Sequence, residues 1–309
     1  MLASGGADKK VILWDTEDGK PRGEPLAEHT EAVLSLAFSR DGKTLASGSQ
    51  DKTIILWDTD ERVALGEPLQ GHDKSVTTLA FGLDGHFLAS GSADKTIIIW
   101  DVADRNKLTR LFGHTDGINS LDFHPKNGLF LASGSRDKKI IIWNWLLTHP
   151  IVEQLSGHDN TILDVAFSPD GSILASTGWD KQIILWDMAT YSYLFSLTGH
   201  TEPVRSLAFS LANESDLTLA SGSDDDTVIL WDLSGHRLSE PLNESSAAVL
   251  SVAVSQDGRF MVSGGDDDAI ILWDIETPDK PKLLNQLEDQ DDVLSLAFSP
   301  FKSDSGRYL

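Results

Sequence analysis

The sequence predicts an all-β protein, a β-propeller of seven four-stranded antiparallel blades whose last blade is shared by the two ends of the chain. Tryptophan followed by Asp, or once by Asn, recurs at spacings of 43, 43, 43, 43, 45 and 42 residues, which indicates one structural unit repeated. β-Branched residues and Gly interrupt every unit, and no stretch keeps a 3.6-residue apolar period, so helices are not expected. The 309 residues are 40% hydrophobic, which is enough for one large core. The repeated tryptophans are Trp14, Trp57, Trp100, Trp143, Trp186, Trp231 and Trp273.

Each unit contains four predicted strands. Residues 32–39 alternate apolar and polar positions and predict the first strand, and Asp41-Gly42 predicts a turn. A strand of small residues follows at 45–49, then a tight turn and the run 53–57, which is apolar on both faces. A variable polar strand ends the unit. A strand that is apolar on both faces must be covered on both, and sheets arranged radially provide that cover.

The two ends of the chain fall inside one unit. Residues 1–8 read as a second strand, and residues 306–309 read as the start of that same strand. We therefore expect one domain over 1–309, in which residues 1–27 and 289–309 form the closing blade together. Whether the chain is an independent protein or part of a longer array is left open by these observations.

Composition narrows the function. The chain has no cysteine, which excludes disulfides and thiolate chemistry and fits a cytoplasmic location. The net charge of −23 disfavours binding to nucleic acid or to an anionic membrane. A highly charged surface keeps a protein soluble, and it also suits a basic partner. No segment resembles a signal peptide or a membrane span.

The motif Gly-His, strand, Leu-Ala-Ser-Gly-Ser-x-Asp, strand, Trp-Asp closely resembles the WD40-repeat family over essentially the whole chain, with a regularity like that of bacterial arrays. The resemblance implies a buried His–Ser–Trp–Asp hydrogen-bond network in each blade. Its members in five blades are His29, Ser47, Asp51 and Trp57; His72, Ser90, Asp94 and Trp100; His114, Ser133, Asp137 and Trp143; His158, Ser176, Asp180 and Trp186; and His200, Ser221, Asp225 and Trp231. Ser245 and Asp289 replace the His in the other two units, so we expect those blades to be less tightly held.

A Ser–His–Asp trio could also indicate hydrolysis. Here the same trio occurs once per blade and always with the same Trp, which favours a structural role. The sequence contains no His-x-x-x-His spacing and no Gly-x-x-x-x-Gly-Lys loop. We predict no catalytic residues, no metal site and no cofactor.

The resemblance also places the loops that enter the innermost strands, and the turns that carry the repeat Asp, on one face that commonly contacts partners. Side chains at these positions vary between units. We predict that the partner-binding residues are Gln50, Asn119, Arg136, Trp179, Arg205, Asp224 and Asp266. Trp179 stands out because Trp and Arg dominate interface hot spots, although it could equally pack over a neighbouring loop. We expect Arg136, Asn119, Trp179 and Arg205 to form one patch.

An acidic sector is expected opposite this patch. Asp224-Asp-Asp226, Asp266-Asp-Asp268 and the carboxylates at 289, 291 and 292 supply it. Calcium could bind carboxylates, but these residues lie in separate units without a ligand loop.

These observations predict a monomeric scaffold or sensor module that binds a partner protein or peptide, with a basic partner favoured by the acidic sector. The alternative is an enzyme, or a small-ligand or metal site, at the mouth of the central channel, because a fold alone does not exclude catalysis. A carboxylate pair with strongly perturbed pKa values in the channel would favour that alternative. A third possibility is an inert, regular array.

Overall fold

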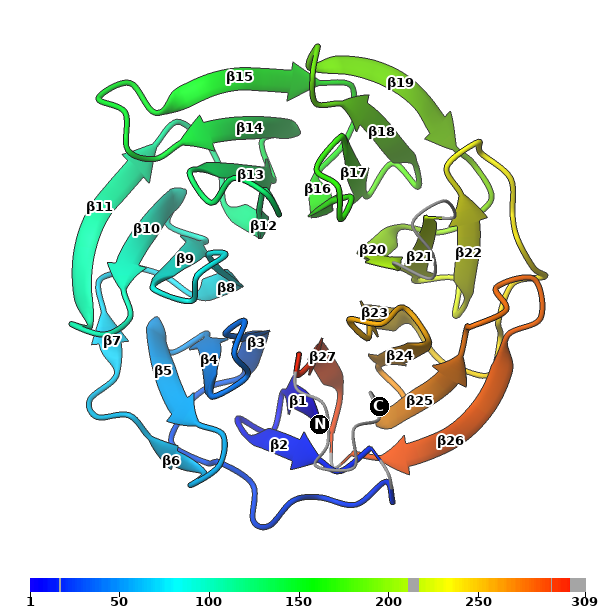
Figure 1. Cartoon of the computed structure of the whole chain (residues 1–309), viewed down its shortest axis with the longest axis horizontal. Helices are drawn as coiled ribbons and strands as arrows, with labels where there is room; N and C mark the ends of the chain where they lie inside the picture. The colour runs from blue at the N-terminus through cyan, green and yellow to red at the C-terminus, as the bar shows by residue number, and fades with distance from the viewer. Residues whose placement is uncertain (17, 211–216, 290, 301–309) are drawn as a thin grey trace.

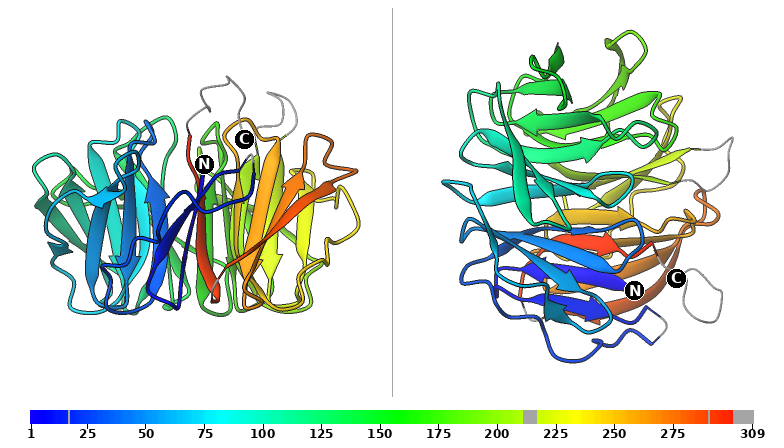
Figure 2. Two further views of the ribbon diagram at one scale, coloured as in Figure 1. Left: turned by 90° about the horizontal axis from the view of Figure 1, so that it is seen from below. Right: turned by 60° about the vertical axis from the view of Figure 1, so that its left-hand side comes forward.

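The computed structural model describes residues 1–16, 18–210, 217–289 and 291–300, and these contain 27 β-strands and no helix. The strands form seven sheets arranged radially around one axis (Figure 1), which confirms the predicted fold class. No helix among the described residues is long and apolar enough to cross a membrane. Each sheet stands along the axis of a disc (Figure 2).

We number six blades in chain order and call the seventh the closing blade. Blade 1 contains β3 (Val33–Phe38), β4 (Thr44–Ser49), β5 (Thr53–Asp58), β6 (Val63–Ala64) and β7 (Leu69–Gln70). Blade 2 contains β8 (Val76–Phe81), β9 (Phe87–Ser92), β10 (Thr96–Asp101) and β11 (Asn106–Phe112). Blade 3 contains β12 (Ile118–Phe123), β13 (Phe130–Ser135), β14 (Lys139–Asn144) and β15 (Ile151–Ser156).

The remaining blades follow the same order from the axis outward. Blade 4 contains β16 (Ile162–Phe167), β17 (Ile173–Gly178), β18 (Ile183–Asp187) and β19 (Ser192–Leu197). Blade 5 contains β20 (Val204–Ser210), β21 (Thr218–Ser223) and β22 (Val228–Asp232). Blade 6 contains β23 (Val249–Val254), β24 (Phe260–Gly265), β25 (Ala269–Asp274) and β26 (Lys282–Glu288). The closing blade contains β27 (Val293–Phe298), β1 (Leu2–Gly6) and β2 (Val11–Trp14).

The outermost strand is not continuous in every blade, so the prediction of four strands throughout was wrong in detail. Blade 5 and the closing blade have three-stranded sheets, and in blade 1 the outer strand is split into β6 and β7. A Gly-Glu-Pro or Ser-Glu-Pro segment crosses the outer position in these blades, at 23–25, 66–68 and 239–241. Proline has no N–H for the ladder, and Gly23 and Gly66 turn the chain at φ values of 82° and 86°.

The ring closes through β1, which pairs with β2 on one side and with β27 on the other. Leu2 lies opposite Phe298 and Ser4 lies opposite Leu296, so the first and last described strands share one sheet (Figure 1). The predicted seam at 306–309 lies outside the described residues. The N-terminal and C-terminal segments of the predicted closing blade therefore meet at the innermost strand pair.

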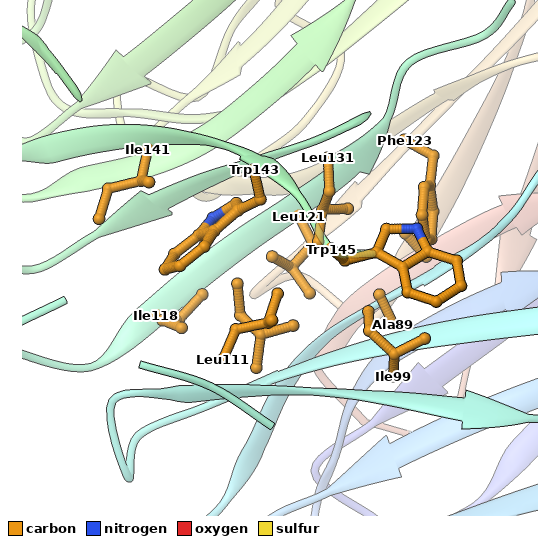
Figure 3. Close-up of a cluster of buried hydrophobic side chains, with 12 residues drawn as sticks. Ala89, Ile99, Leu111, Ile118, Leu121, Phe123, Leu131, Ile141, Trp143 and Trp145 are labelled. Carbon is orange, nitrogen blue, oxygen red and sulfur yellow. The ribbon is translucent and has the colours of Figure 1, made fainter. Parts of the chain in front are cut away.

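The core is divided into seven apolar clusters, one between each pair of neighbouring blades. Figure 3 shows the cluster between blades 2 and 3, where Trp143 and Trp145 lie among aliphatic side chains. The small residues of the second strands permit this packing. A Cβ atom on Gly134, for example, would lie 2.6 Å from Cγ2 of Ile162 in the next blade. Each sheet therefore depends on both neighbours for its burial.

A ring of hydrogen bonds also joins the innermost strands. At the third position of each strand a side-chain oxygen accepts from the backbone N–H at the fourth position of the next blade, over 2.7 to 3.2 Å. The acceptors are Ser35, Thr78, Ser120, Asp164, Ser206, Ser251 and Ser295. Six are hydroxyls and one is a carboxylate, and the ring passes through the closing blade without a gap.

Candidate functional site

The predicted His–Ser–Trp–Asp residues lie together in blades 1 to 5. In blade 3, the Trp143 indole N–H donates to the Ser133 hydroxyl over 2.8 Å. The other two links join His114 to Ser133 at 2.7 Å and to Asp137 at 2.9 Å. The Nδ1–H group of His114 donates a hydrogen bond to the Asp137 carboxylate, so the unprotonated Nε2 accepts a hydrogen bond from the Ser133 hydroxyl. The hydroxyl is thus held between two rings and is 0% exposed, with no free side for a substrate.

Electrostatics of the network follow from these bonds. Burial alone would raise the pKa of Asp94, but hydrogen bonds from His72 and Thr96 hold that pKa well below its usual range. The pKa values of Asp51, Asp137, Asp180 and Asp225 are lowered in the same way, against their own burial. A carboxylate that stays ionised and hydrogen-bonded fixes the orientation of its His. The role of these aspartates is therefore structural.

The two units that lack the His differ from the His–Ser–Trp–Asp network in different ways. In blade 6, Ser245 bonds Asp267 at 2.8 Å, and the Trp273 N–H lies 3.4 Å from Ser263. That longer bond matches the expected weakening. In the closing blade the Ser4 hydroxyl donates directly to Asp289 over 2.6 Å, and the Trp14 bond to Ser4 keeps the usual 2.8 Å. Here the carboxylate replaces the imidazole, so the expected weakening is absent at this bond.

We call the face formed by the second-to-third-strand turns and by the loops entering the innermost strands the upper face. On it, Trp179 is 47% exposed. The guanidinium of Arg205 from blade 5 lies 5.1 Å from the centre of the Trp179 ring. Asp224 accepts two bonds from that guanidinium, at 2.6 and 2.8 Å. These three residues, the Trp179 unit, form a fixed cation–π and ion-pair stack.

Arg136 and Asn119 form a second contact on the same face. The exposed Arg136 donates through Nε to the Asn119 amide oxygen over 3.1 Å, and the Asn119 amide donates to the Ile162 carbonyl over 2.8 Å. The predicted patch therefore consists of two bonded groups from neighbouring blades. Among the described residues, no hydrogen bond or ion pair joins these groups to Gln50 or Asp266, which are exposed on blades 1 and 6.

The acidic sector needs two corrections. Asp224 does not belong to it, because Arg205 neutralises that carboxylate within the Trp179 unit. The carboxylates also do not all lie apart: ligand atoms of Asp268, Asp291 and Asp292 come within 4.8 Å of one another. Slight burial and the charges of Asp266, Asp291 and Asp268 raise the pKa of Asp292. Because Ca²⁺ takes six to eight oxygen ligands, we treat these three side chains as an acidic surface.

Two carboxylates of the innermost strands, Asp122 and Asp164, are not among the residues predicted from the sequence. Asp164 stands where six blades have Ser or Thr, and Asp122 stands where the others have Ala. Burial raises the pKa of Asp122 to about 7, with a further contribution from the charge of Asp164, against a 2.7 Å bond from the Phe167 amide. Burial also raises the pKa of Asp164 to about 6, against its hydrogen bonds. Comparing equivalent positions across the repeats would have revealed both.

Asp122 and Asp164 are a carboxylate pair with raised pKa values, which would favour catalysis. Their hydrogen bonds show whether their role is catalytic or structural. Asp164 uses both oxygens: one accepts from the Ser120 hydroxyl at 2.6 Å and the other from the Leu207 amide at 2.7 Å. Asp122 binds the next blade through the Phe167 amide. Both residues therefore join blades 3, 4 and 5. Neither lines either of the two pockets described between blades.

The repeats match a known family model, "WD domain, G-beta repeat", at residues 19–58, 65–101, 105–144, 150–187, 191–232 and 234–274. The chain belongs to the WD40-repeat family. The closing blade, split between the two ends of the chain, lies outside the six matched ranges. No curated protein matches the sequence.

WD40 propellers among the solved structures are similar to this chain. The structure titled "Structure of U3-55K" has 26% identity and a TM-score of 0.79, over 89% of this chain and 87% of the other. The WD40 repeats of RRP9 have 23% identity and a TM-score of 0.81, over 97% of this chain and 90% of the other. At these identities the likeness supports the fold, and the side chains of the upper face must be interpreted from this chain alone.

Proposed function

We propose that this WD40 propeller is a protein-interaction module that binds a partner protein or peptide on its upper face, without catalysis, and that Trp179 is the main anchor. The observation that supports this proposal most is the Trp179 unit. An indole that is 47% exposed contributes little to the core. The guanidinium of Arg205 nevertheless packs over it and is itself held by the ion pair with Asp224. A rigid exposed aromatic side chain loses little conformational entropy on binding, which favours affinity.

The partner's charge is part of the proposal. Asp266, Asp268, Asp291 and Asp292 crowd one sector and repel one another, as the raised pKa of Asp292 indicates. A cationic segment would relieve that repulsion and would be attracted by the net charge of −23. We therefore favour a basic protein or peptide over nucleic acid or membrane. A monomeric module and a cytoplasmic location stay predictions.

The catalytic alternative is less well supported. Asp122 and Asp164 have the raised pKa values that a general acid or base can use. One oxygen of each carboxylate, however, accepts from a backbone amide of the next blade, and the second oxygen of Asp164 accepts from the Ser120 hydroxyl. A group that holds the ring together is poorly placed to exchange protons with a substrate, so we assign the pair to the frame.

Alanine substitution tests the proposal. Trp179→Ala and Arg136→Ala should each reduce quantitative capture of partner proteins from native extract, Trp179→Ala by about tenfold or more, with the melting temperature unchanged. Tyr193→Ala is the matched control, because Tyr193 is 55% exposed but lies on the outer strand β19. Equal capture by wild type and Trp179→Ala would refute the role of the upper face.

A further inference from the structure

A pocket of about 380 Å³ lies between blades 3 and 4 on the lower face, the face formed by the first-to-second-strand and third-to-fourth-strand turns. Its walls include His124, Phe130 and Ile142 of blade 3, and Phe167, Gly171 and Met188 of blade 4. Its size and its apolar walls with a few polar groups are typical of ligand sites. No lysine or arginine lines it. It is separate from the upper face.

The neighbouring groove, between blades 2 and 3, has the same construction but is filled by Trp145. Trp145 follows the repeat Trp143 by two positions, as Met188 follows Trp186. The backbone amides of both residues make the same bond, from Trp145 to the Leu129 carbonyl at 3.3 Å and from Met188 to the Ser172 carbonyl at 2.9 Å. The two side chains therefore start from equivalent points in the two grooves.

The walls are equivalent as well. The Trp145 ring packs edge-to-face on Phe87, with centroids 5.0 Å apart, and shares a cluster with Ile99 and Phe123 (Figure 3). The repeat places Phe130, Ile142 and Phe167 at those same positions around the pocket. Trp145 is only 6% exposed. The chain itself thus shows which side chain fits between such walls.

Polar groups also lie in both grooves. The Trp145 indole N–H donates to the carbonyl of Gly128, two residues before β13, over 3.0 Å. Gly171 stands two residues before β17 in the wall of the pocket, in a turn that is one residue shorter and in which Gly171 has a φ of 75°. One further donor is specific to this groove. Nδ1 of His124 accepts from the Lys126 and Asn127 amides at 3.2 Å, which places the ring proton on Nε2.

We propose that this pocket binds an aromatic side chain, preferentially tryptophan, from a partner protein. The incoming indole would pack on Phe130 and Ile142, in the place that Trp145 takes in the neighbouring groove, and beside the His124 ring, whose centroid lies 5.2 Å from that of Phe167. The shorter, flexible Met188 forms the floor, and a thioether packs well against aromatic rings. The pocket gives the module a second interaction site, on the face opposite the Trp179 unit.

Titration of the methyl-labelled full chain with N-acetyl-tryptophanamide, followed by NMR, tests the proposal. The methyl signals of Met188 and Ile142 should shift with saturation, and N-acetyl-leucinamide should bind at least tenfold more weakly. Met188→Trp should fill the pocket, raise the melting temperature and weaken binding at least tenfold. Met188→Leu is the matched control for folding and should bind within about threefold of wild type.

Trp179→Ala should leave this titration unchanged, which separates the pocket from the upper-face proposal. Equal binding of the two amides, or full binding by a folded Met188→Trp variant, would overturn the assignment.

Discussion

Asp122→Asn should stabilise the protein at alkaline pH and have little effect at acidic pH. Burial and the charge of Asp164 raise the pKa of Asp122 to about 7 in the folded chain, whereas an unperturbed aspartate has a pKa of about 3.9. Between those two values the folded state binds the proton more strongly than the unfolded state. Stability therefore falls as the pH rises from about 4 to about 7, and the full cost is present above pH 7.

The size of the effect follows from the same difference. Each pKa unit is worth about 1.4 kcal/mol, so a fully enclosed Asp122 would cost the folded state about 4 kcal/mol at pH 8. The side chain is half-buried, and solvent screening reduces that figure. We expect the Asn variant to gain about 2 kcal/mol at pH 8. The Asn amide oxygen can still accept from the Phe167 amide, so the 2.7 Å bond between blades is kept.

Urea unfolding of both proteins at pH 4.5, 6, 7 and 8, followed by tryptophan fluorescence, measures this difference. Asp279→Asn removes the same formal charge from an exposed loop and serves as the control. The free-energy gain of Asp122→Asn should grow with pH, whereas that of Asp279→Asn should stay near zero. A gain that is independent of pH, or a loss at pH 8, would show that ionised Asp122 does not destabilise the folded chain.

Three further predictions concern the frame. Ser245→His should restore the network of blade 6 and stabilise the protein by about 1 kcal/mol, which a rise in the melting temperature would reveal and an unchanged value would contradict. Gly134→Ala should lower the free energy of unfolding by about 1–3 kcal/mol in chemical denaturation, because the new Cβ would lie 2.6 Å from Ile162. Gly82→Ala is the control and should be nearly neutral, since its nearest contact is 3.5 Å away. Equal losses for the two variants would count against close packing of the blades. Deletion of residues 1–14 removes β1 and β2 and should abolish the cooperative thermal transition; a truncated chain that melts like the full one would exclude shared closure.

The fold could be predicted from the sequence because each unit repeats the same local pattern. The apolar run 53–57 requires cover on both faces, and the ring supplies it. The broken outer strands were harder to predict, because a polar pattern does not show that Pro68 lies in an interruption between β6 and β7, which pair with opposite ends of β5. Outer strands have one free edge, so their pairing depends less on pattern and more on individual Gly and Pro residues.

The candidate site was only partly predictable. Variation at turn positions identified Trp179, Arg205 and Asp224, but sequence spacing placed Asp224 in the acidic sector. Only the folded chain brings its carboxylate against the Arg205 guanidinium. The pocket beside Met188 was not predicted. It exists because Met188 leaves space in its groove, whereas Trp145 fills the equivalent groove between blades 2 and 3. A column-by-column comparison of the repeats would have shown that difference.

Isothermal titration of a captured partner against wild type, Trp179→Ala and Tyr193→Ala measures directly how much the Trp179 unit contributes to binding. If the upper face is the binding surface, Trp179→Ala should weaken binding by about tenfold or more, and Tyr193→Ala should bind as wild type does. Dissociation constants that agree for all three proteins would show that this propeller does not recognise its partner through the Trp179 unit.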